Sequence, residues 1–358
     1  MSKNPKNSPL IPPLSLKEFK TNLLGAKKIL LSTHQLPDGD GLGAELALYH
    51  YLKSKKKECV IINPDPLPAR YQFLDPKKEI FNSQRTDSED WDLWIILDTN
   101  DPRRLGPLWE NLYGRARKII FLDHHTDLVQ DTGISIPAHT QMISNPKLSS
   151  IGELLYEVFQ AIGFEQPRPE VALGLYVSVM TDTNSFRSAQ TTPAAHHIAG
   201  ELLALGIQPE EIYQTIYSSK ESSHLKLLGR LLQNLEETPD QQIAWIKLER
   251  SLLNEYEAVA DDTLSFLNLL LLIRKAEIIC FFREEDHGKT RVSMKSKGRV
   301  RINALAMELG GGGHENAAGA SLSCSLDEAI EQVIQKLQAL LASSSKASPS
   351  THERRNPS

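Results

Sequence analysis

Short apolar runs alternate with amphipathic stretches through the first half of this chain. The apolar runs have the length of strands and the stretches between them have the spacing of helices. In chain order they are KKILLST, GAELALYHYLK, CVIIN, WDLWIILD, RKIIFLD and SSIGELLYEVFQAIG. Strands that alternate with helices pair in parallel and are covered by those helices. The sequence therefore predicts an α/β fold with a parallel sheet that has helices on both faces.

The chain has 358 residues, which is enough for two domains. Helical patterns run from about Pro169 to Leu235, and strand-like runs return near Gln242. The predicted divisions are a disordered start (1–14), a first domain (15–219), a linker helix (220–237), a smaller α/β second domain (238–342) and a disordered tail (343–358). We expect a cleft for the ligand between the two domains.

Composition excludes several functional classes. The formal charge of −5 argues against binding duplex DNA through general positive charge, so an anionic ligand needs a local basic patch. The three cysteines, Cys59, Cys280 and Cys324, are scattered and fit free thiols in a reducing compartment. The start of the chain does not resemble an export signal, and no apolar run approaches the roughly 20 residues of a membrane helix. We expect a cytoplasmic protein that does not bind membranes.

Acidic residues and histidines gather where three of the predicted strands end. These residues are His34, Asp38 and Asp40 after the first strand, Asp98 at the end of WDLWIILD, and Asp123, His124 and His125 at the end of RKIIFLD. Ligands of open parallel sheets bind beyond the carboxyl ends of the strands, so the clusters should converge. Around the first cluster, Pro37 and the glycines at 39, 41 and 43 predict a tight turn rather than a helix.

The candidate ligands of a metal centre are His34, Asp38, Asp40, Asp98, His124 and Asp182. Oxygen and nitrogen ligands without thiolates favour Mn²⁺, or less strongly Mg²⁺ or Co²⁺, over a structural zinc. Six ligands are too many for one catalytic ion with an open position, but they suit two divalent cations that share a carboxylate. Such a pair clamps the attacking and leaving oxygens at phosphorus. Each segment alone could be an ordinary turn, loop or helix cap, and their agreement is what favours hydrolysis of phosphate esters.

Four segments resemble a known family. In order, HQLPDGDGLGA, WIILDTND, FLDHHTD and VMTDTNSF are similar to the signatures of the DHH phosphoesterases, and RVSMKSK followed by GGGGHENAAG is similar to the DHHA1 domain. The resemblance implies a DHH catalytic domain followed by a DHHA1 substrate-binding domain. The layout most resembles the nanoRNase type, which degrades very short oligoribonucleotides and often removes the 3′-phosphate of pAp.

The resemblance also implies roles for individual residues. His34 and Asp38 would bind one ion, Asp40, His124 and Asp182 the other, and Asp98 both. Asp123 would orient the neighbouring histidines, and His125 would act as general acid for the leaving oxygen, since histidine can donate a proton near neutral pH. The family usually has glycine where this chain has Asn184, and asparagine tolerates the positive φ that such a turn requires.

A basic segment in the second half is the candidate grip on the substrate. Residues 288–302 include six lysines and arginines and no acidic residue, and alternation along a strand places Arg291 and Lys295 on one side. Relatives usually carry arginine at the position of Lys295. Lysine keeps the positive charge of arginine but lacks its bidentate fork. Gly312 and Gly313 would let the backbone approach a phosphate that His314 contacts. The alternatives are a solvated edge strand guarded by lysines and a flexible glycine loop.

Two alternatives to the degradation of short oligoribonucleotides to mononucleotides remain open. One is hydrolysis of linear or cyclic dinucleotide messengers such as pApA and cyclic di-AMP, which the same cleft could hold. The other, from a different class, is a nucleotide-binding sensor without turnover. The expected ligands are short oligonucleotides or small nucleotides, not duplex DNA, and a homodimer is an open alternative for the assembly.

Overall fold

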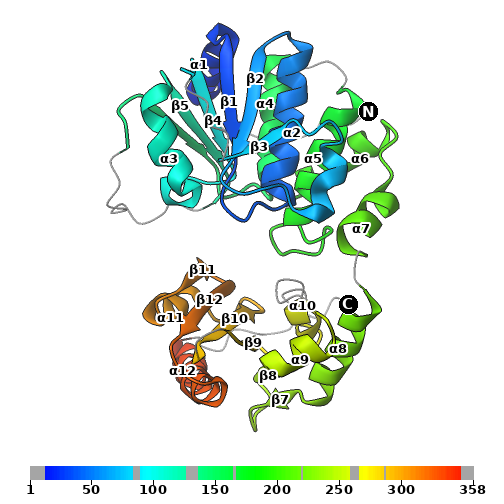
Figure 1. Cartoon of the computed structure of the whole chain (residues 1–358), viewed down its shortest axis with the longest axis vertical. Helices are drawn as coiled ribbons and strands as arrows, with labels where there is room; N and C mark the ends of the chain where they lie inside the picture. The colour runs from blue at the N-terminus through cyan, green and yellow to red at the C-terminus, as the bar shows by residue number, and fades with distance from the viewer. Residues whose placement is uncertain are drawn as a thin grey trace, which may run out of the picture. The chain divides into compact units, whose positions relative to one another are not determined.

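The structure is a computed structural model that describes residues 13–83, 89–125, 136–163, 167–218, 221–258, 266–285 and 288–347. The chain divides into two compact units between residues 219 and 220 (Figure 1). Within the described ranges, no helix combines the length and the apolar character that crossing a membrane requires.

Six parallel strands form the sheet of the first unit. They are β1 (Lys28–Ser32), β2 (Glu58–Asn63), β3 (Ile80–Asn82), β4 (Leu93–Leu97), β5 (Ile119–Asp123) and β6 (Thr140–Ser144), in the spatial order β3-β2-β1-β4-β5-β6. Every residue of β4 and β5 is buried, as expected for strands covered on both faces. The predicted parallel sheet is confirmed.

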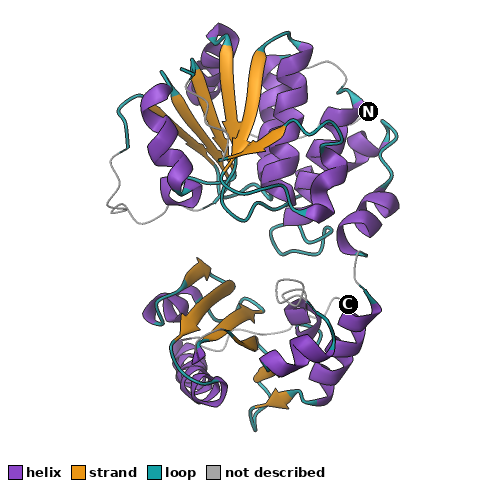
Figure 2. Cartoon of the chain, in the orientation of Figure 1, coloured by secondary structure: helices purple, strands orange, loops and turns teal. Residues whose placement is uncertain are grey.

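Helices cover both faces of this sheet (Figure 2). The apolar core on one face includes residues of α1 (Pro13–Gly25), α2 (Gly39–Ser54), α4 (Ile151–Ile162), α5 (Pro169–Asp182), α6 (Pro193–Leu203) and α7 (Pro209–Tyr217). The other face packs against α3 (Pro107–Leu112), where Trp94, Trp109 and Phe121 form an aromatic cluster. Short 3₁₀ turns lie at Ala69–Leu74 (η1), Pro102–Leu105 (η2) and Tyr113–Arg115 (η3).

The strand order reverses between β1 and β4, which are neighbours although β2 and β3 intervene in sequence. Such a reversal leaves a crevice beyond the carboxyl ends of the two strands, because the connections leave in opposite directions. His34 follows β1 and Asp98 follows β4, so both lie at this crevice.

The second unit is a smaller α/β unit with a mixed sheet. Its strands are β7 (Glu236–Glu237), β8 (Ile243–Leu248), β9 (Ile278–Glu284), β10 (Thr290–Ser296), β11 (Gly312–His314) and β12 (Ala317–Leu322), in the order β11-β12-β10-β9-β8-β7. Only the β8–β9 pair is parallel among these described strands. The helices are α8 (Ser222–Gln233), α9 (Arg250–Glu255), α10 (Phe266–Leu270), α11 (Asn303–Glu308) and α12 (Leu326–Ala347).

Each face of the second sheet has its own apolar core. Val292 and Met294 of β10 pack on the side of α11 and α12. Phe281 of β9 packs on the opposite side, with leucines of α8 and α10. Residues 220–237, predicted as a linker helix, thus include α8, whose Leu227 and Leu231 are part of this second core.

Two helices extend into the segments predicted to be disordered. Residues 13–14 belong to α1, where proline is compatible with the first helical turn. Residues 343–347 belong to α12, where the hydroxyls of Ser343 and Ser344 donate hydrogen bonds back to the carbonyl of Leu340, at 2.7 and 3.0 Å. The remaining residues of both predicted tails, 1–12 and 348–358, lie outside the described part of the chain.

Candidate active site

The reversal of strand order brings His34 and Asp98 together. Nε2 of His34 lies 3.3 Å from Oδ2 of Asp98, and both side chains are buried. Asp98 has φ 65, in the left-handed region, while its backbone N–H donates to the carbonyl of Leu122 at 2.9 Å. A non-glycine residue in this region costs on the order of 1 kcal/mol or more, and such strain is concentrated at functional sites. The backbone is thus bent so that the carboxylate points into the crevice.

The segment predicted as a tight turn instead begins helix α2. Asp38 is the N-cap, and its Oδ1 accepts from the backbone N–H groups of Asp40 at 3.0 Å and Gly41 at 3.3 Å. Gly41 is needed for packing rather than for a turn, since a Cβ there would lie 2.2 Å from Oγ1 of Thr33. The prediction was wrong because glycine at a close helix contact and glycine in a turn look alike in sequence.

Two more glycines bring α2 against α5. A Cβ on Gly43 would lie 2.4 Å from the carbonyl oxygen of Gly174, and one on Gly174 would lie 2.4 Å from that of Gly43. The two helix backbones therefore approach as closely as helices can. This contact places Asp40, in the first turn of α2, near Asp182, the last residue of α5.

Asp40 is held by two neighbouring helices. Its Oδ2 accepts from the backbone N–H of Ile151 at 3.0 Å, at the positive end of α4, and its Oδ1 accepts a short hydrogen bond from Ser178 of α5. Burial and the neighbouring carboxylate of Asp98 raise the pKa of Asp40 to about 6. An ionised carboxylate in this position requires positive charge nearby.

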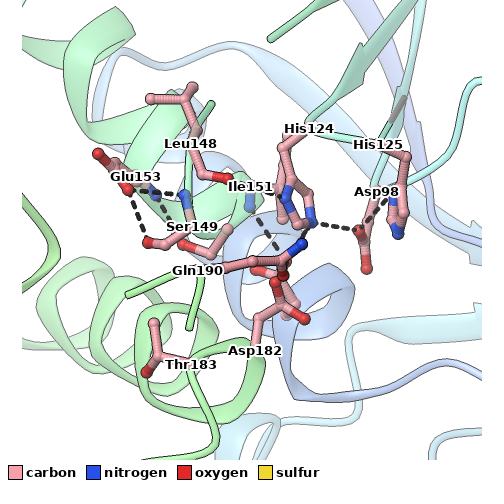
Figure 3. Close-up of polar contacts among 12 residues, drawn as sticks. Asp98, His124, His125, Leu148, Ser149, Ile151, Glu153, Asp182, Thr183 and Gln190 are labelled. Carbon is pink, nitrogen blue, oxygen red and sulfur yellow. Dashed lines mark hydrogen bonds and ion pairs between the residues drawn. The ribbon is translucent and has the colours of Figure 1, made fainter. Parts of the chain in front are cut away.

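His124 faces the carboxylates of Asp40, Asp98 and Asp182, and Figure 3 shows the last two beside it. Its Nε2 lies 3.2 Å from Oδ2 of Asp40, 3.5 Å from Oδ1 of Asp98 and 3.5 Å from Oδ2 of Asp182. Its Nδ1 lies 3.4 Å from the carbonyl of Leu148, a contact that favours the tautomer with the proton on Nδ1 and the lone pair on Nε2. Burial, together with the charge of Asp40, raises the pKa of Asp182 to about 8.

Asp123 and His125 form a pair at the edge of this cluster. Nδ1 of His125 lies 2.6 Å from Oδ1 of Asp123, which is fully buried at the end of β5. The same Nδ1 lies 3.8 Å from Oδ1 of Asp98, and the His125 side chain is 23% exposed. A buried carboxylate that binds one ring nitrogen fixes the orientation of the imidazole. His125 is therefore held in place with part of its ring accessible.

Three groups of side chains could each hold a cation, because within each group the ligand atoms lie within 4.8 Å of one another. They are His34 with Asp38 and Asp98, Asp40 with His124 and Asp182, and Asp98 with His124 and His125. Oδ1 of Asp98, Nε2 of His124 and Oδ2 of Asp182 are buried without a hydrogen-bond partner among the described residues. Buried atoms of this kind need a partner, and carboxylates crowded together repel each other, so the donor set fits bound cations.

Sequence analysis missed the residues that support this cluster. Glu153 accepts from the N–H and hydroxyl of Ser149, at 2.8 and 2.6 Å, and from the hydroxyl of Thr192 at 2.9 Å. These contacts fix the start of α4, whose first N–H binds Asp40. The Ser150-x-x-Glu153 spacing before an apolar run is a helix-start signal, and it could have revealed the supporting role of Glu153 at the start of α4. Figure 3 also shows the Gln190 side chain directed into the cluster.

The turn after Asp182 is left-handed, as Asn184 suggested. Asn184, Ser185 and Phe186 have φ of 50, 58 and 63. Thr183 anchors the turn, since its hydroxyl accepts from the N–H of Phe186 at 3.1 Å and its carbonyl accepts from the N–H groups of Arg187 and Ser188 at 2.9 Å. The expectation that asparagine preserves this conformation is confirmed.

Comparison with known proteins identifies the family. The model of the N-terminal domain of the DHH family matches residues 28–179, and that of the DHHA1 domain matches residues 250–343. The chain thus contains a DHH-family N-terminal domain and a DHHA1 domain. The resemblance predicted from its four segments and from the glycine-rich segment is thus confirmed, together with its class as a phosphoesterase.

Relatives of known function match almost the whole chain. The bifunctional oligoribonuclease and PAP phosphatase NrnA of Thermus thermophilus is 29% identical, over 87% of this chain and 89% of the relative. The protein of the same name from Bacillus subtilis is 27% identical, over 87% and 94%. A crystal structure of an exopolyphosphatase-related protein from Bacteroides fragilis has a TM-score of 0.85 and 28% identity, over 94% of this chain and all of that one.

Proposed function

We propose that this protein degrades short oligoribonucleotides to mononucleotides and removes the 3′-phosphate of pAp, using two divalent cations. The observation that carries the proposal is the convergence of two groups, His34 with Asp38 and Asp98, and Asp40 with His124 and Asp182. Asp98 links them, since its Oδ1 lies 3.5 Å from Nε2 of His124. The two relatives named for both activities match the chain across the catalytic and the DHHA1 domains, which supports the substrate class.

The ligand assignment follows these groups. His34 and Asp38 would hold one cation, Asp40, His124 and Asp182 would hold the other, and the two carboxylate oxygens of Asp98 would contact both. We assign Mn²⁺, with Mg²⁺ or Co²⁺ as alternatives, because the donors are oxygen and nitrogen without thiolate. When bound, a pair of such cations would supply a nucleophile at neutral pH and neutralise charge on the phosphate.

We assign His125 as the general acid. Asp123 binds its Nδ1 at 2.6 Å, so the imidazole is oriented. The other ring nitrogen, Nε2, would then carry the proton that passes to the leaving oxygen, and the exposed part of the ring gives a substrate access to it. Asp123 acts through His125 and is a positioning residue.

We assign recognition of the remaining substrate phosphates to the second unit. Arg291 and Lys295 lie on the same side of β10, with Val292 and Met294 on the buried side. Burial lowers the pKa of Lys295, whose Nζ donates to Oδ1 of Asn268 at 2.6 Å. This hydrogen bond fixes the position of the ammonium group, which would contact a phosphate as a point charge.

The glycine-rich segment contributes backbone groups at the edge of the same sheet. Gly313 has φ 139, and a Cβ there would lie 2.5 Å from the carbonyl oxygen of Ala317, so β11 could not pair with β12 if it had a side chain. A Cβ on Gly312 would meet no other atom within 4 Å. We propose that a phosphate approaches the backbone at Gly312 and Gly313 and that His314, the last residue of β11, contacts it.

A substrate panel tests the function. Purified protein with Mn²⁺ is incubated with pApA, a five-nucleotide RNA, pAp, cyclic di-AMP and pyrophosphate, and nucleotides and phosphate are quantified. We expect AMP from pApA and pAp and mononucleotides from the RNA. A preference for cyclic di-AMP would favour the messenger alternative, and binding without any product would favour the sensor.

Replacement of the shared ligand is the companion experiment. Asp98→Ala should lower turnover of every substrate by about 10³-fold or more, because both cations lose a ligand. The exposed Asp327→Ala, on α12, serves as the control with the same chemical change. Residual turnover of Asp98→Ala above a tenth of the original rate would contradict the shared role.

A further inference from the structure

Two exposed tyrosines lie side by side on helix α7. Ile212 and Ile216 anchor this helix in the core of the first unit. Tyr213 and Tyr217 each follow one of these isoleucines and therefore occupy the adjacent side of the helix, where they are 41% and 37% exposed. Their ring centroids are 4.8 Å apart, and the ring planes are inclined by 47°. The helix thus presents two neighbouring aromatic rings to solvent.

Helix α7 is near the proposed active site. It packs against η1, and η1 also packs against α2 and α5, the helices that carry Asp40 and Asp182. Burial raises the pKa of the Tyr217 hydroxyl, and the negative charge of Asp38 acts on this hydroxyl in the same direction. Asp38 is the N-cap of α2 and one of the proposed cation ligands. The exposed rings are therefore beside the end of α2 where the cation cluster lies.

A third tyrosine at this place is already covered. Tyr71 of η1 is 3% exposed, and the guanidinium carbon of Arg70 lies 4.9 Å from the centre of its ring. Burial raises the pKa of Tyr71 to about 12, while the charge of Arg70 opposes this change and that of Asp38 adds to it. Arg70 is exposed and acts in the same way on the hydroxyl of Tyr217. A cation thus lies next to the two rings that a ligand can reach.

We propose that Tyr213 and Tyr217 form a platform on which a nucleobase of the substrate stacks while a phosphate is bound at the cation cluster. An exposed aromatic ring accepts any of the four bases, because every base has a π face. The guanidinium group of Arg70 beside the rings complements the negative charge of a nucleotide. The platform would favour nucleotides over phosphates without a base, such as pyrophosphate. This inference rests on the proposed function, because it assigns recognition of the base of that substrate.

A fluorescent base tests the platform without turnover. 2-Aminopurine loses fluorescence when it stacks on an aromatic ring, so its 3′,5′-bisphosphate is titrated in Mg²⁺ with the His125→Gln protein, in which we expect turnover to be slow. Tyr213→Leu and Tyr217→Leu, each added to this protein, should reduce the quenching and weaken binding about tenfold. Tyr113→Leu, a 36% exposed tyrosine of η3 next to α3, is the control and should change neither. Equal quenching in all four proteins would overturn the platform.

Removal of the base from the substrate tests the platform during turnover. With Mn²⁺, Tyr217→Leu should raise the KM for pAp about tenfold and leave kcat within twofold. The KM for an analogue of pAp that carries hydrogen in place of adenine should change by less than twofold. Tyr217→Phe keeps the ring, so its KM for pAp should stay within twofold of the original value. An equal rise of both KM values in Tyr217→Leu would show that the tyrosine does not contact the base, and the proposal would be wrong.

The platform and the proposed function fail separately. If the wild-type protein hydrolyses none of its expected substrates, the proposed function fails, and the quenching of 2-aminopurine still decides the platform. Thermal unfolding of each variant verifies the fold. If leucine at one position prevents folding, the other position provides the test, because both rings belong to the platform. A folded leucine variant with unchanged quenching and unchanged KM for pAp would exclude its ring from base binding.

Discussion

Glu45 makes the stability of the first unit depend on pH. It lies on α2 with no exposed surface, and its Oε2 accepts from Nδ2 of Asn63 at 2.8 Å. Oδ1 of Asn63 in turn accepts from the backbone N–H of Thr33 at 2.8 Å, one residue before His34. Oε1 of Glu45 has no hydrogen-bond partner among the described residues. Burial outweighs the Asn63 hydrogen bond and raises the pKa of Glu45 from 4.5 to about 8.

The sign of the effect follows from the direction of this change. Because the pKa is higher in the folded protein than in the unfolded chain, the stabilisation is fully present below pH 4.5 and is lost as the pH rises to about 8. The two pKa values lie roughly 3.5 pH units apart, and each unit corresponds to about 1.4 kcal/mol. The loss is therefore on the order of 5 kcal/mol, as an upper value.

Urea unfolding of the wild type and of Glu45→Gln, from pH 4.5 to 8.5 at one fixed Mn²⁺ concentration, measures this loss. Glutamine is uncharged throughout, has nearly the same shape and can still accept from Asn63. The other titrating groups are common to both proteins, so they cancel in the difference of unfolding free energies. We expect this difference to grow in favour of the variant by about 1.4 kcal/mol per pH unit between the two pKa values and to level off above pH 8. A difference that stays constant would falsify the argument from burial.

Two further predictions concern the general acid and the contact between α2 and α5. His125→Gln should lower kcat for pApA by roughly 10²–10⁴-fold. Because Asp123 acts through His125, adding Asp123→Asn to this variant should lower kcat little further. Additive losses of kcat in the double variant would contradict this coupling. Gly43→Ala should destabilise by about 1–3 kcal/mol in urea, because its Cβ would lie 2.4 Å from a carbonyl oxygen of α5. A Cβ on Gly200 of α6 would meet no atom within 4 Å, so Gly200→Ala should be neutral or stabilising by about 0.5–1 kcal/mol. Equal changes in stability for the two variants would disprove the packing explanation.

The convergence of the polar clusters could be predicted from sequence because parallel strands have a fixed direction. Once RKIIFLD and WDLWIILD are assigned as parallel strands, the polar residues at their carboxyl ends must lie at the same edge of the sheet. This conclusion does not require knowing which strands are neighbours. The role of Glu45 could not be predicted in this way. In GAELALYHYLK a single glutamate suggests the exposed side of an amphipathic helix, whereas α2 is buried nearly all round and the glutamate lies inside.

The tyrosine pair shows a second limit of sequence analysis. Alternation along β10 correctly placed Arg291 and Lys295 on one side, because the period of a strand is a local property. The period of a helix likewise places Tyr213 and Tyr217 on one side of α7. That this side lies near Asp38 depends on the packing of α7 against η1, which joins segments distant in sequence. A local pattern does not predict such a contact.

Under the proposed assignments, catalysis and substrate selection depend on different parts of the fold and should be separable. His34 and Asp98 are 64 residues apart and meet only because β1 pairs with β4, while Asp40 and Asp182 meet because two glycines let α2 approach α5. Changes at these contacts should therefore reduce turnover of all substrates in similar proportion. The basic residues of β10 belong to another sheet with its own core, so their replacement should alter the ranking of substrates while the rate of the chemical step is preserved.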